Sequence, residues 1–113
     1  GDGPALNRET HEIAEQNGVL AVCRKHEIEF VDLNTDNLVK VENPLGFTEI
    51  KEFLLPESAQ KSDLLISVPK LKTHHWALMT ASLKNMFGVL PGRKYGWPKN
   101  ILHVQGINAS ILD

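Results

Sequence analysis

The sequence predicts an α/β fold for residues 1–113, with a mixed sheet flanked by helices. Segments with period-two alternation are interspersed with segments of helical spacing. Residues 63–69 form a short, almost continuously apolar run that leads directly into a helical pattern, and such a run is typical of a strand buried on both faces. A chain of 113 residues, 42% hydrophobic and 23% charged, fits one globular domain.

The first half is predicted to hold two helices followed by strands. Asn7 suits the N-cap and Gly18 the end of the first helix, so we expect that helix over residues 7–18. After the helices, alternation of apolar and polar residues predicts strands, and turn-forming residues between them predict turns. The other elements expected before residue 62 are a short helix at 19–26, strands at 28–33 and 38–42 joined as a hairpin through a turn at 34–37, a third strand at 47–55, and a helical turn at 56–61.

The second half is predicted to be mainly helical. Trp76, Met79, Leu83 and Phe87 recur at helical spacing, which predicts a long helix starting at Thr73. Gly88, Pro91 and Gly92 then end it, residues 93–100 form a loop, and residues 101–112 form a last helix. Because the chain starts without Met and stops inside this last predicted helix, we expect a fragment of a larger α/β domain.

The charges are divided unevenly along the chain. Residues 1–63 contain 13 acidic and 6 basic residues, whereas residues 64–112 contain no Asp or Glu. The cationic and imidazole groups of that second interval are Lys70, Lys72, Lys84, Arg93, Lys94 and Lys99 with His74, His75 and His103. Cations without local carboxylates must face solvent, the acidic half of the chain, or a bound anion.

The residues between the apolar run and the predicted helix form the candidate site. Open α/β sheets bind ligands where a strand ends and a helix begins, and free N–H groups at a helix start attract anions. We expect Lys70, Lys72 and the helix start, with Thr73 as N-cap, to hold an anion. The further candidates are Thr80 as a hydrogen-bond donor, Lys84 as a charge-neutralising or covalently attaching group, His74 as the acid–base group, and Asn85 and Arg93 as additional ligand contacts.

Plainer interpretations stand beside this one. The lysines can be solvated surface residues, and Trp76 and Phe87 can simply pack in the core. A metal site built from this segment is not expected without nearby carboxylates or Cys, and Cys23, the sole cysteine, forms neither an internal disulfide nor an iron–sulfur site unaided. A pI near 6.2 and sparse basic residues argue against nucleic acid, although Trp97 and Trp76 can stack on bases. Since no apolar run approaches the roughly 18 residues of a membrane span, and no signal peptide is visible, a cytoplasmic location is expected.

Two sequence motifs resemble a known family. Residues 62–74, Ser-Asp-Leu-Leu-Ile-Ser-Val-Pro-Lys-Leu-Lys-Thr-His, and residues 80–88, Thr-Ala-Ser-Leu-Lys-Asn-Met-Phe-Gly, are similar to the motifs of domain of unknown function 362. The resemblance covers residues 62–92 closely and implies a bacterial or archaeal protein. Some members carry a ferredoxin-like module with two four-iron clusters. This chain lacks the Cys-rich motifs, so the resemblance implies an iron–sulfur partner elsewhere and no intrinsic cluster.

A more distant similarity is to the N-terminal domain of nickel-pincer-nucleotide lactate racemase. His74 and Lys84 have the spacing of the His and cofactor-anchoring Lys of that enzyme, but Ala81-Ser82-Leu83 replaces its glycines. Together these patterns predict a domain that binds an anionic cofactor or substrate, nucleotide-like or an organic acid, in a redox-linked setting. The alternative is a non-catalytic module that docks an acidic protein such as an iron–sulfur carrier. The ligand and the reaction stay open.

Overall fold

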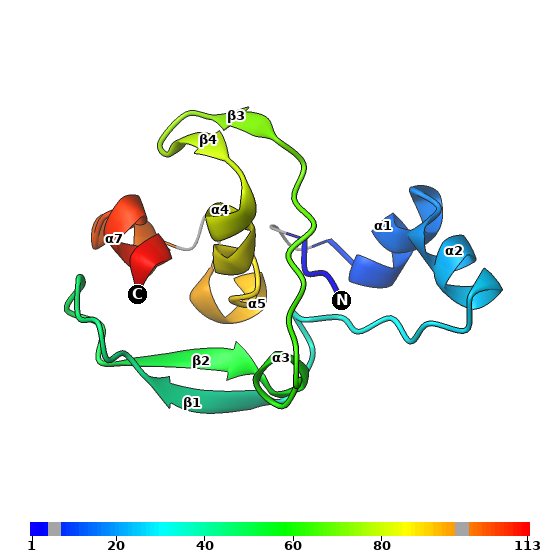
Figure 1. The fold of residues 1–113 in the computed structure, drawn as a ribbon, viewed down its shortest axis with the longest axis horizontal. Coiled ribbons are helices and arrows are strands. Elements are labelled where there is room, and N and C mark those ends of the chain that lie inside the picture. The colour runs from blue at the N-terminus through cyan, green and yellow to red at the C-terminus, as the bar shows by residue number, and fades with distance from the viewer. Residues whose placement is uncertain (5–7, 97–99) are drawn as a thin grey trace.

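Seven short helices and two pairs of strands make up the described part of the chain, which comprises residues 1–4, 8–96 and 100–113 of this computed structural model (Figure 1). The helices are α1 (Thr10–Gln16), α2 (Val19–Lys25), α3 (Glu57–Gln60), α4 (Ser82–Phe87), α5 (Gly92–Tyr95), α6 (Asn100–Val104) and α7 (Ile107–Leu112). The strands are β1 (Leu38–Glu42), β2 (Glu52–Pro56), β3 (Lys72–His74) and β4 (Leu78–Thr80). The α/β class predicted from the sequence is confirmed. Asn7, Trp97 and Lys99 lie outside the described residues.

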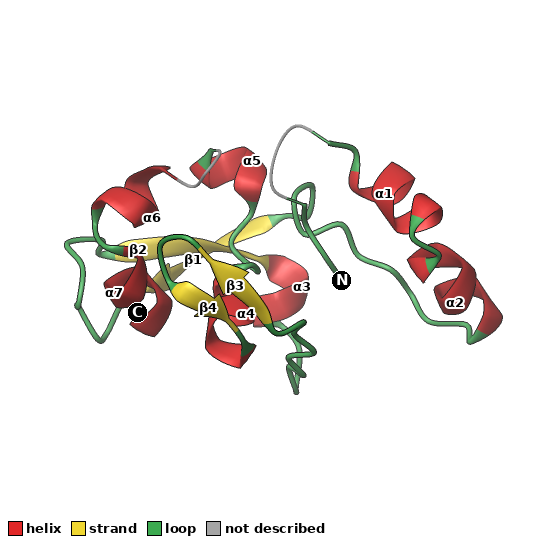
Figure 2. Ribbon diagram, turned by 90° about the horizontal axis from the view of Figure 1, so that it is seen from above, coloured by secondary structure: helices red, strands yellow, loops and turns green. Residues whose placement is uncertain are grey.

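The two N-terminal helices form an arm beside the rest of the fold (Figures 1 and 2). Their predicted positions are confirmed, with α1 starting after Glu9. Gly18 separates them at a φ of 82°, a left-handed conformation that glycine adopts without steric penalty. Arg24 Nη2 donates to both carboxylate oxygens of Glu15, at 2.7 Å to Oε1 and 2.9 Å to Oε2, and this ion pair joins α2 to α1 across the turn.

The first sheet pairs β1 with β2, antiparallel, with Val41 opposite Phe53. The predicted strand at 38–42 is confirmed, but its expected hairpin partner at 28–33 is wrong. The backbone of that segment bonds to the N-terminus instead: Asp2 N–H donates to the Val31 carbonyl at 3.1 Å, and Leu33 N–H donates to the Asp2 carbonyl at 2.9 Å. The segment therefore contributes only an isolated bridge.

The third predicted strand is shorter than expected. Only its second half, in β2, is a strand, because the side chains of Asp113, which follows α7, and Gln105, which precedes α7, accept the backbone N–H groups of the first half. The Asp113 carboxylate accepts the N–H groups of Phe47 at 2.7 Å and Thr48 at 2.8 Å, and Gln105 accepts that of Glu49 at 3.2 Å. These bonds satisfy backbone donors that a strand would otherwise present to a neighbour.

The buried core lies between the β1–β2 sheet and the helices that cover one of its faces (Figure 1). It is formed by Phe53 from β2, Phe87 from α4, Leu90, and Leu102 from α6, which is fully buried. Half-buried Ile50, Leu55, Tyr95 and Ile111 pack around it. The Tyr95 hydroxyl accepts the Leu54 N–H at 2.7 Å, so α5 is fixed to β2 by a hydrogen bond as well as by packing.

Residues 63–69 do not form the predicted buried strand. They run as a single extended segment (Figure 1), and no backbone–backbone hydrogen bond joins them to other described residues. Their apolar side chains face outward: Ile66 is 77% exposed and Val68 82%. A strand pattern is realised only when a neighbouring strand pairs with it, and the described residues place none beside this one.

The predicted helix from Thr73 is also wrong in its first half. Residues 72–80 form the β3–β4 hairpin, with Lys72 opposite Thr80, and α4 starts only at Ser82. Two features of the turn exclude a helix there. The side chain of His74 bonds to backbone N–H groups of the turn, and Leu78 has a φ of 60°.

The C-terminal region differs from the prediction in two places. The expected loop at 93–100 contains the short helix α5, and the single last helix is split into α6 and α7. The break lies at Gly106, whose φ of 97° is incompatible with a continuing helix. The Ser110 hydroxyl donates to the Leu102 carbonyl at 2.7 Å and fixes the angle between the two helices.

Candidate functional site

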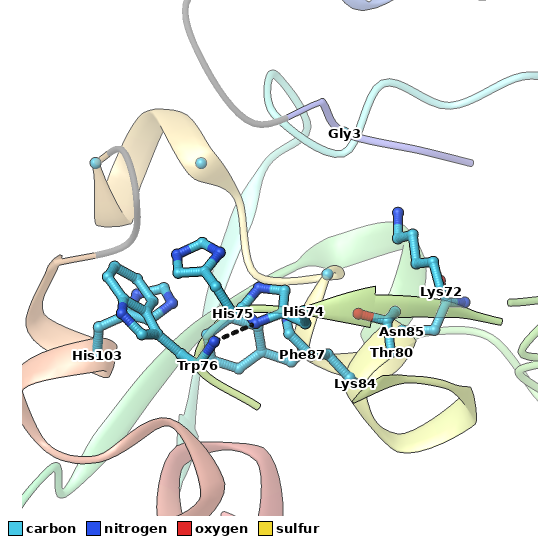
Figure 3. A pocket seen from close by; sticks show the side chains of 13 residues that line it. Gly3, Lys72, His74, His75, Trp76, Thr80, Lys84, Asn85, Phe87 and His103 are labelled. Atoms are coloured by element: carbon cyan, nitrogen blue, oxygen red, sulfur yellow. Dashed lines mark hydrogen bonds between the residues drawn. The ribbon is translucent and has the colours of Figure 1, made fainter. Parts of the chain in front are cut away.

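A cleft of about 580 Å³ is lined by residues of the β3–β4 hairpin and α4, by His103 of α6, and by Gly92 and Gly96 at the two ends of α5 (Figure 3). Five of the eight residues predicted from the sequence line it. They are Lys72, His74, Thr80, Lys84 and Asn85. Sequence segments that were expected to form one helix thus reach a common cavity from a hairpin and a separate helix.

The alternation of side chains along β3 determines which of them face the cleft. Side chains alternate across a strand, so Lys72 and His74 face the cleft and Thr73 between them does not. Lys70 precedes the strand and is exposed outside the cleft. Arg93 lies on α5, and its Nη2 is 3.0 Å from Glu9 Oε1, so its charge is directed to the α1 arm.

His74 is held in one orientation by the hairpin turn. Its Nδ1 accepts the N–H of Trp76 at 3.2 Å, the dashed line in Figure 3, and that of Ala77 at 3.1 Å. A neutral imidazole that accepts at Nδ1 carries its proton on Nε2. Burial lowers the pKa of His74, and Lys84, His75, His103 and Lys72 lower it further. His74 therefore stays neutral near pH 7 and offers its Nε2–H as a hydrogen-bond donor, and its acid–base role stays a prediction.

Lys84 is half-buried in the cleft, on α4. Burial lowers its pKa first, and the charge of Lys72 lowers it further. Its Nζ lies 5.0 Å from the centroid of the Phe87 ring, a cation–π distance. Two ammonium groups thus share a cavity whose described lining contains no carboxylate. A site of this composition attracts anions.

Thr80 provides a buried hydroxyl at the end of β4. The residue is 7% exposed, and its Oγ1 has no hydrogen-bond partner among the described residues. An unpaired buried hydroxyl destabilises a fold by about 1–3 kcal/mol, so such groups usually meet a ligand atom or water. Thr80 is therefore placed to bond to an occupant of the cleft.

Asn85 contributes to the cleft and also holds its supporting elements together. Its Nδ2 donates to Ser67 Oγ at 3.1 Å, and that hydroxyl donates to the Ser82 carbonyl at 3.2 Å. The extended segment before the hairpin is thereby attached to α4. Positioning is the role that these contacts support for Asn85.

Aromatic rings line the side of the cleft opposite Lys72 (Figure 3). The rings of His74 and His75 are stacked with centroids 4.9 Å apart, Trp76 lies 4.6 Å from His75, and His103 lies 4.4 Å from Trp76. Sequence reasoning assigned Trp76 to the core and His103 to an ordinary helix position. Only the hairpin brings them together, and no local signal identifies a contact between residues 27 positions apart.

Glycines were also missed as lining residues. Gly88, Gly92 and Gly96 border the cleft, and an added Cβ at Gly88 would lie 2.8 Å from the Asn85 carbonyl oxygen. The sequence did contain one indication of this, since the family-like motif ends in Gly88 and a glycine after a helix can mark a place where other atoms approach the backbone closely.

Two further properties of the described residues bear on the class of site. No group of three or more His, Cys, Asp or Glu residues lies together in them as a metal would require. None of their helices has the length and apolar character to cross a membrane.

Comparisons with known proteins place the chain in a family. The family described as "Domain of unknown function (DUF362)" matches residues 1–113. A thylakoid-associated protein, sll1697, from Synechocystis sp. is 31% identical over 97 residues, which cover 86% of this chain and 28% of the relative. The chain thus spans little more than a quarter of that relative's length. No solved structure matches this chain. With the whole of its length matched, the chain belongs to the family of domain of unknown function 362.

Proposed function

We propose that the cleft binds a small organic anion, as a cofactor or substrate. The observation that carries this proposal is the pairing of Lys72 with Lys84 in a cavity whose described lining contains no carboxylate. The buried, unpartnered Thr80 hydroxyl and the Nε2–H of His74 add neutral donors beside the two cations. Together they match the acceptor-rich surface of a phosphate or carboxylate.

The aromatic side favours an anion that carries a flat ring. Trp76 is 49% exposed, so about half of its surface remains accessible beside His75 and His103. Lys72 and Thr80 lie on the opposite side (Figure 3). A nucleotide-like ligand can place its phosphate against the lysines and its base against Trp76. A cavity of about 580 Å³ falls within the usual size of such sites.

The proposal predicts which substitutions weaken binding. A hydrogen bond to a charged group contributes about 1.5–3 kcal/mol, so Lys84→Ala should raise Kd about tenfold to a hundredfold. Lys72→Ala should act similarly. Lys94→Ala is the matched control, because Lys94 is exposed and outside the cleft but removes the same unit of charge.

The test is isothermal titration with adenosine monophosphate, ribose 5-phosphate and inorganic phosphate, with circular dichroism to confirm folding of each variant. Tighter binding of the monophosphate than of the sugar phosphate supports the contribution of the ring. Equal losses of affinity in Lys84→Ala and Lys94→Ala would contradict a site in the cleft. That pattern, with a steep decrease in affinity as salt rises, would instead support the docking of an acidic protein partner such as an iron–sulfur carrier.

A further inference from the structure

The amine of Lys84 differs from the other described lysines in its surroundings. The other described lysines are exposed, and two of them, Lys40 and Lys61, pair with glutamates. Lys84 is half-buried, and within the described ranges it forms no ion pair. A lysine in this setting is a candidate nucleophile as well as a charge.

The chemistry of an amine depends on its protonation. Only the neutral amine has the lone pair that attacks carbon, and desolvation or a second cation increases the neutral fraction. Burial and Lys72 both act in this direction and lower the pKa of Lys84. The Phe87 ring, whose centroid lies 5.0 Å from Nζ, is a cation–π partner for the ammonium form. Burial and the neighbouring Lys72 therefore favour the neutral amine of Lys84 more than that of an exposed lysine.

The groups around Lys84 suit a ligand that has both a carbonyl and an anionic group. Lys72 offers a charge for a carboxylate, and the buried Thr80 hydroxyl, which lacks a partner among the described residues, is available to a second oxygen. We infer that Lys84 forms an imine with the carbonyl carbon of a small carbonyl-bearing carboxylate of the 2-oxo acid class, held by Lys72 in the cleft. This inference rests on the proposed anion site and adds a covalent step to it.

The step is balanced without any oxidant or reductant. The lone pair of Lys84 Nζ adds to the carbonyl carbon, the C=O π pair moves to oxygen, and a proton passes from nitrogen to that oxygen. The resulting carbinolamine loses its hydroxyl together with the remaining N–H proton as water, and the nitrogen lone pair forms the C=N bond to Lys84. Thr80 and His74 Nε2–H are donors that can stabilise the oxygen during addition. Hydrolysis reverses the step.

The experiment is reductive trapping with glyoxylate as the probe. Cyanoborohydride supplies hydride to the imine and leaves a stable carboxymethyl group on the lysine, which peptide mass mapping locates. We expect Lys84 to be modified first, and inorganic phosphate to protect it. Lys84→Arg keeps the charge but cannot form the imine, so its labelling at this position should be lost while phosphate binding persists. Lys94→Arg is the control that should retain full labelling at Lys84.

The outcomes separate the two proposals. Labelling spread evenly over exposed lysines, with Lys84 no faster than Lys70, would overturn the covalent step. If phosphate still binds in that case, anion binding stands alone. If Lys84 is labelled rapidly but the protein binds neither phosphate nor nucleotide, imine formation at Lys84 is supported and reversible anion binding in the cleft is contradicted. Thr80→Val gives a second readout, because removing the hydroxyl should slow labelling without changing the lysine.

Discussion

Replacing His74 by alanine should weaken the β3–β4 hairpin and with it the cleft. The substitution removes the acceptor for two backbone N–H groups, those of Trp76 and Ala77. Each neutral hydrogen bond contributes about 0.5–1.5 kcal/mol net, and the two donors lie near the surface, where water can partly replace the acceptor. We therefore expect the free energy of unfolding to decrease by about 1–2 kcal/mol.

A rescue variant separates the turn bonds from the imidazole itself. In His74→Asn the side-chain oxygen lies near the position of Nδ1 and can accept the same N–H groups, so most of the lost stability should return. Ligand binding should remain weaker in this variant, since the Nε2–H donor is absent. Urea unfolding followed by circular dichroism measures the first effect, and titration with adenosine monophosphate measures the second.

The pH dependence of stability provides an independent check on His74. Its pKa is lowered below the ordinary value of 6.5 by burial and by nearby cationic and imidazole groups, namely Lys84, His75, His103 and Lys72. The unfolded chain then binds this proton more readily than the folded protein. The contribution of neutral His74 to the free energy of unfolding is therefore complete above about pH 6.5 and is lost as the pH falls further. His74→Asn should flatten this part of the curve. Equal stability of wild type, His74→Ala and His74→Asn at every pH would refute the reasoning.

Three further substitutions test the site and the core. Thr80→Val removes a buried hydroxyl that has no partner among the described residues, so stability should hold or rise slightly while affinity for phosphate falls; urea unfolding and titration measure the two. Tyr95→Phe deprives the Leu54 N–H of its acceptor and should reduce stability by about 1–3 kcal/mol in urea, with cleft binding unchanged. Leu102→Ala empties a fully buried position and should reduce stability by about 2–5 kcal/mol, and a loss below 1 kcal/mol would contradict its place in the core.

The charge pattern of the sequence is reflected in the residues that line the cleft. The interval from 64 to 112 lacks acidic residues, and the described lining of the cleft lacks them too, although its residues come from several elements. The composition of this interval predicts that of the cleft because most of the lining residues lie within it. The spacing of Thr80 and Lys84 was interpreted as one helix, yet both reach the cleft because α4 follows β4 after a single residue.

The secondary structure between 63 and 80 could not be predicted from periodicity. Trp76, Met79 and Leu83 have helical spacing, but the bonds from the His74 side chain to the turn exclude a helix there. Other decisive contacts are long-range: Asn34 Oδ1 accepts the N–H of Gly92, 58 positions away, at 2.7 Å. Such a bond fixes the start of α5 against the N-terminal half, and no local pattern indicates it.

The motif that identifies the family has a structural explanation in this arrangement. Ser67, at the start of the motif, accepts a hydrogen bond from Asn85 and donates one to the carbonyl of Ser82. This link fixes the extended segment to α4, the helix that carries Lys84, while the hairpin between them carries Lys72 and His74. Ser67 and Asn85 thus attach the segment that leads into the hairpin to the helix on the other side of the cleft. Within residues 62–92, the cationic groups Lys72 and Lys84 and the bonds of Ser67 and Asn85 thus lie on neighbouring elements.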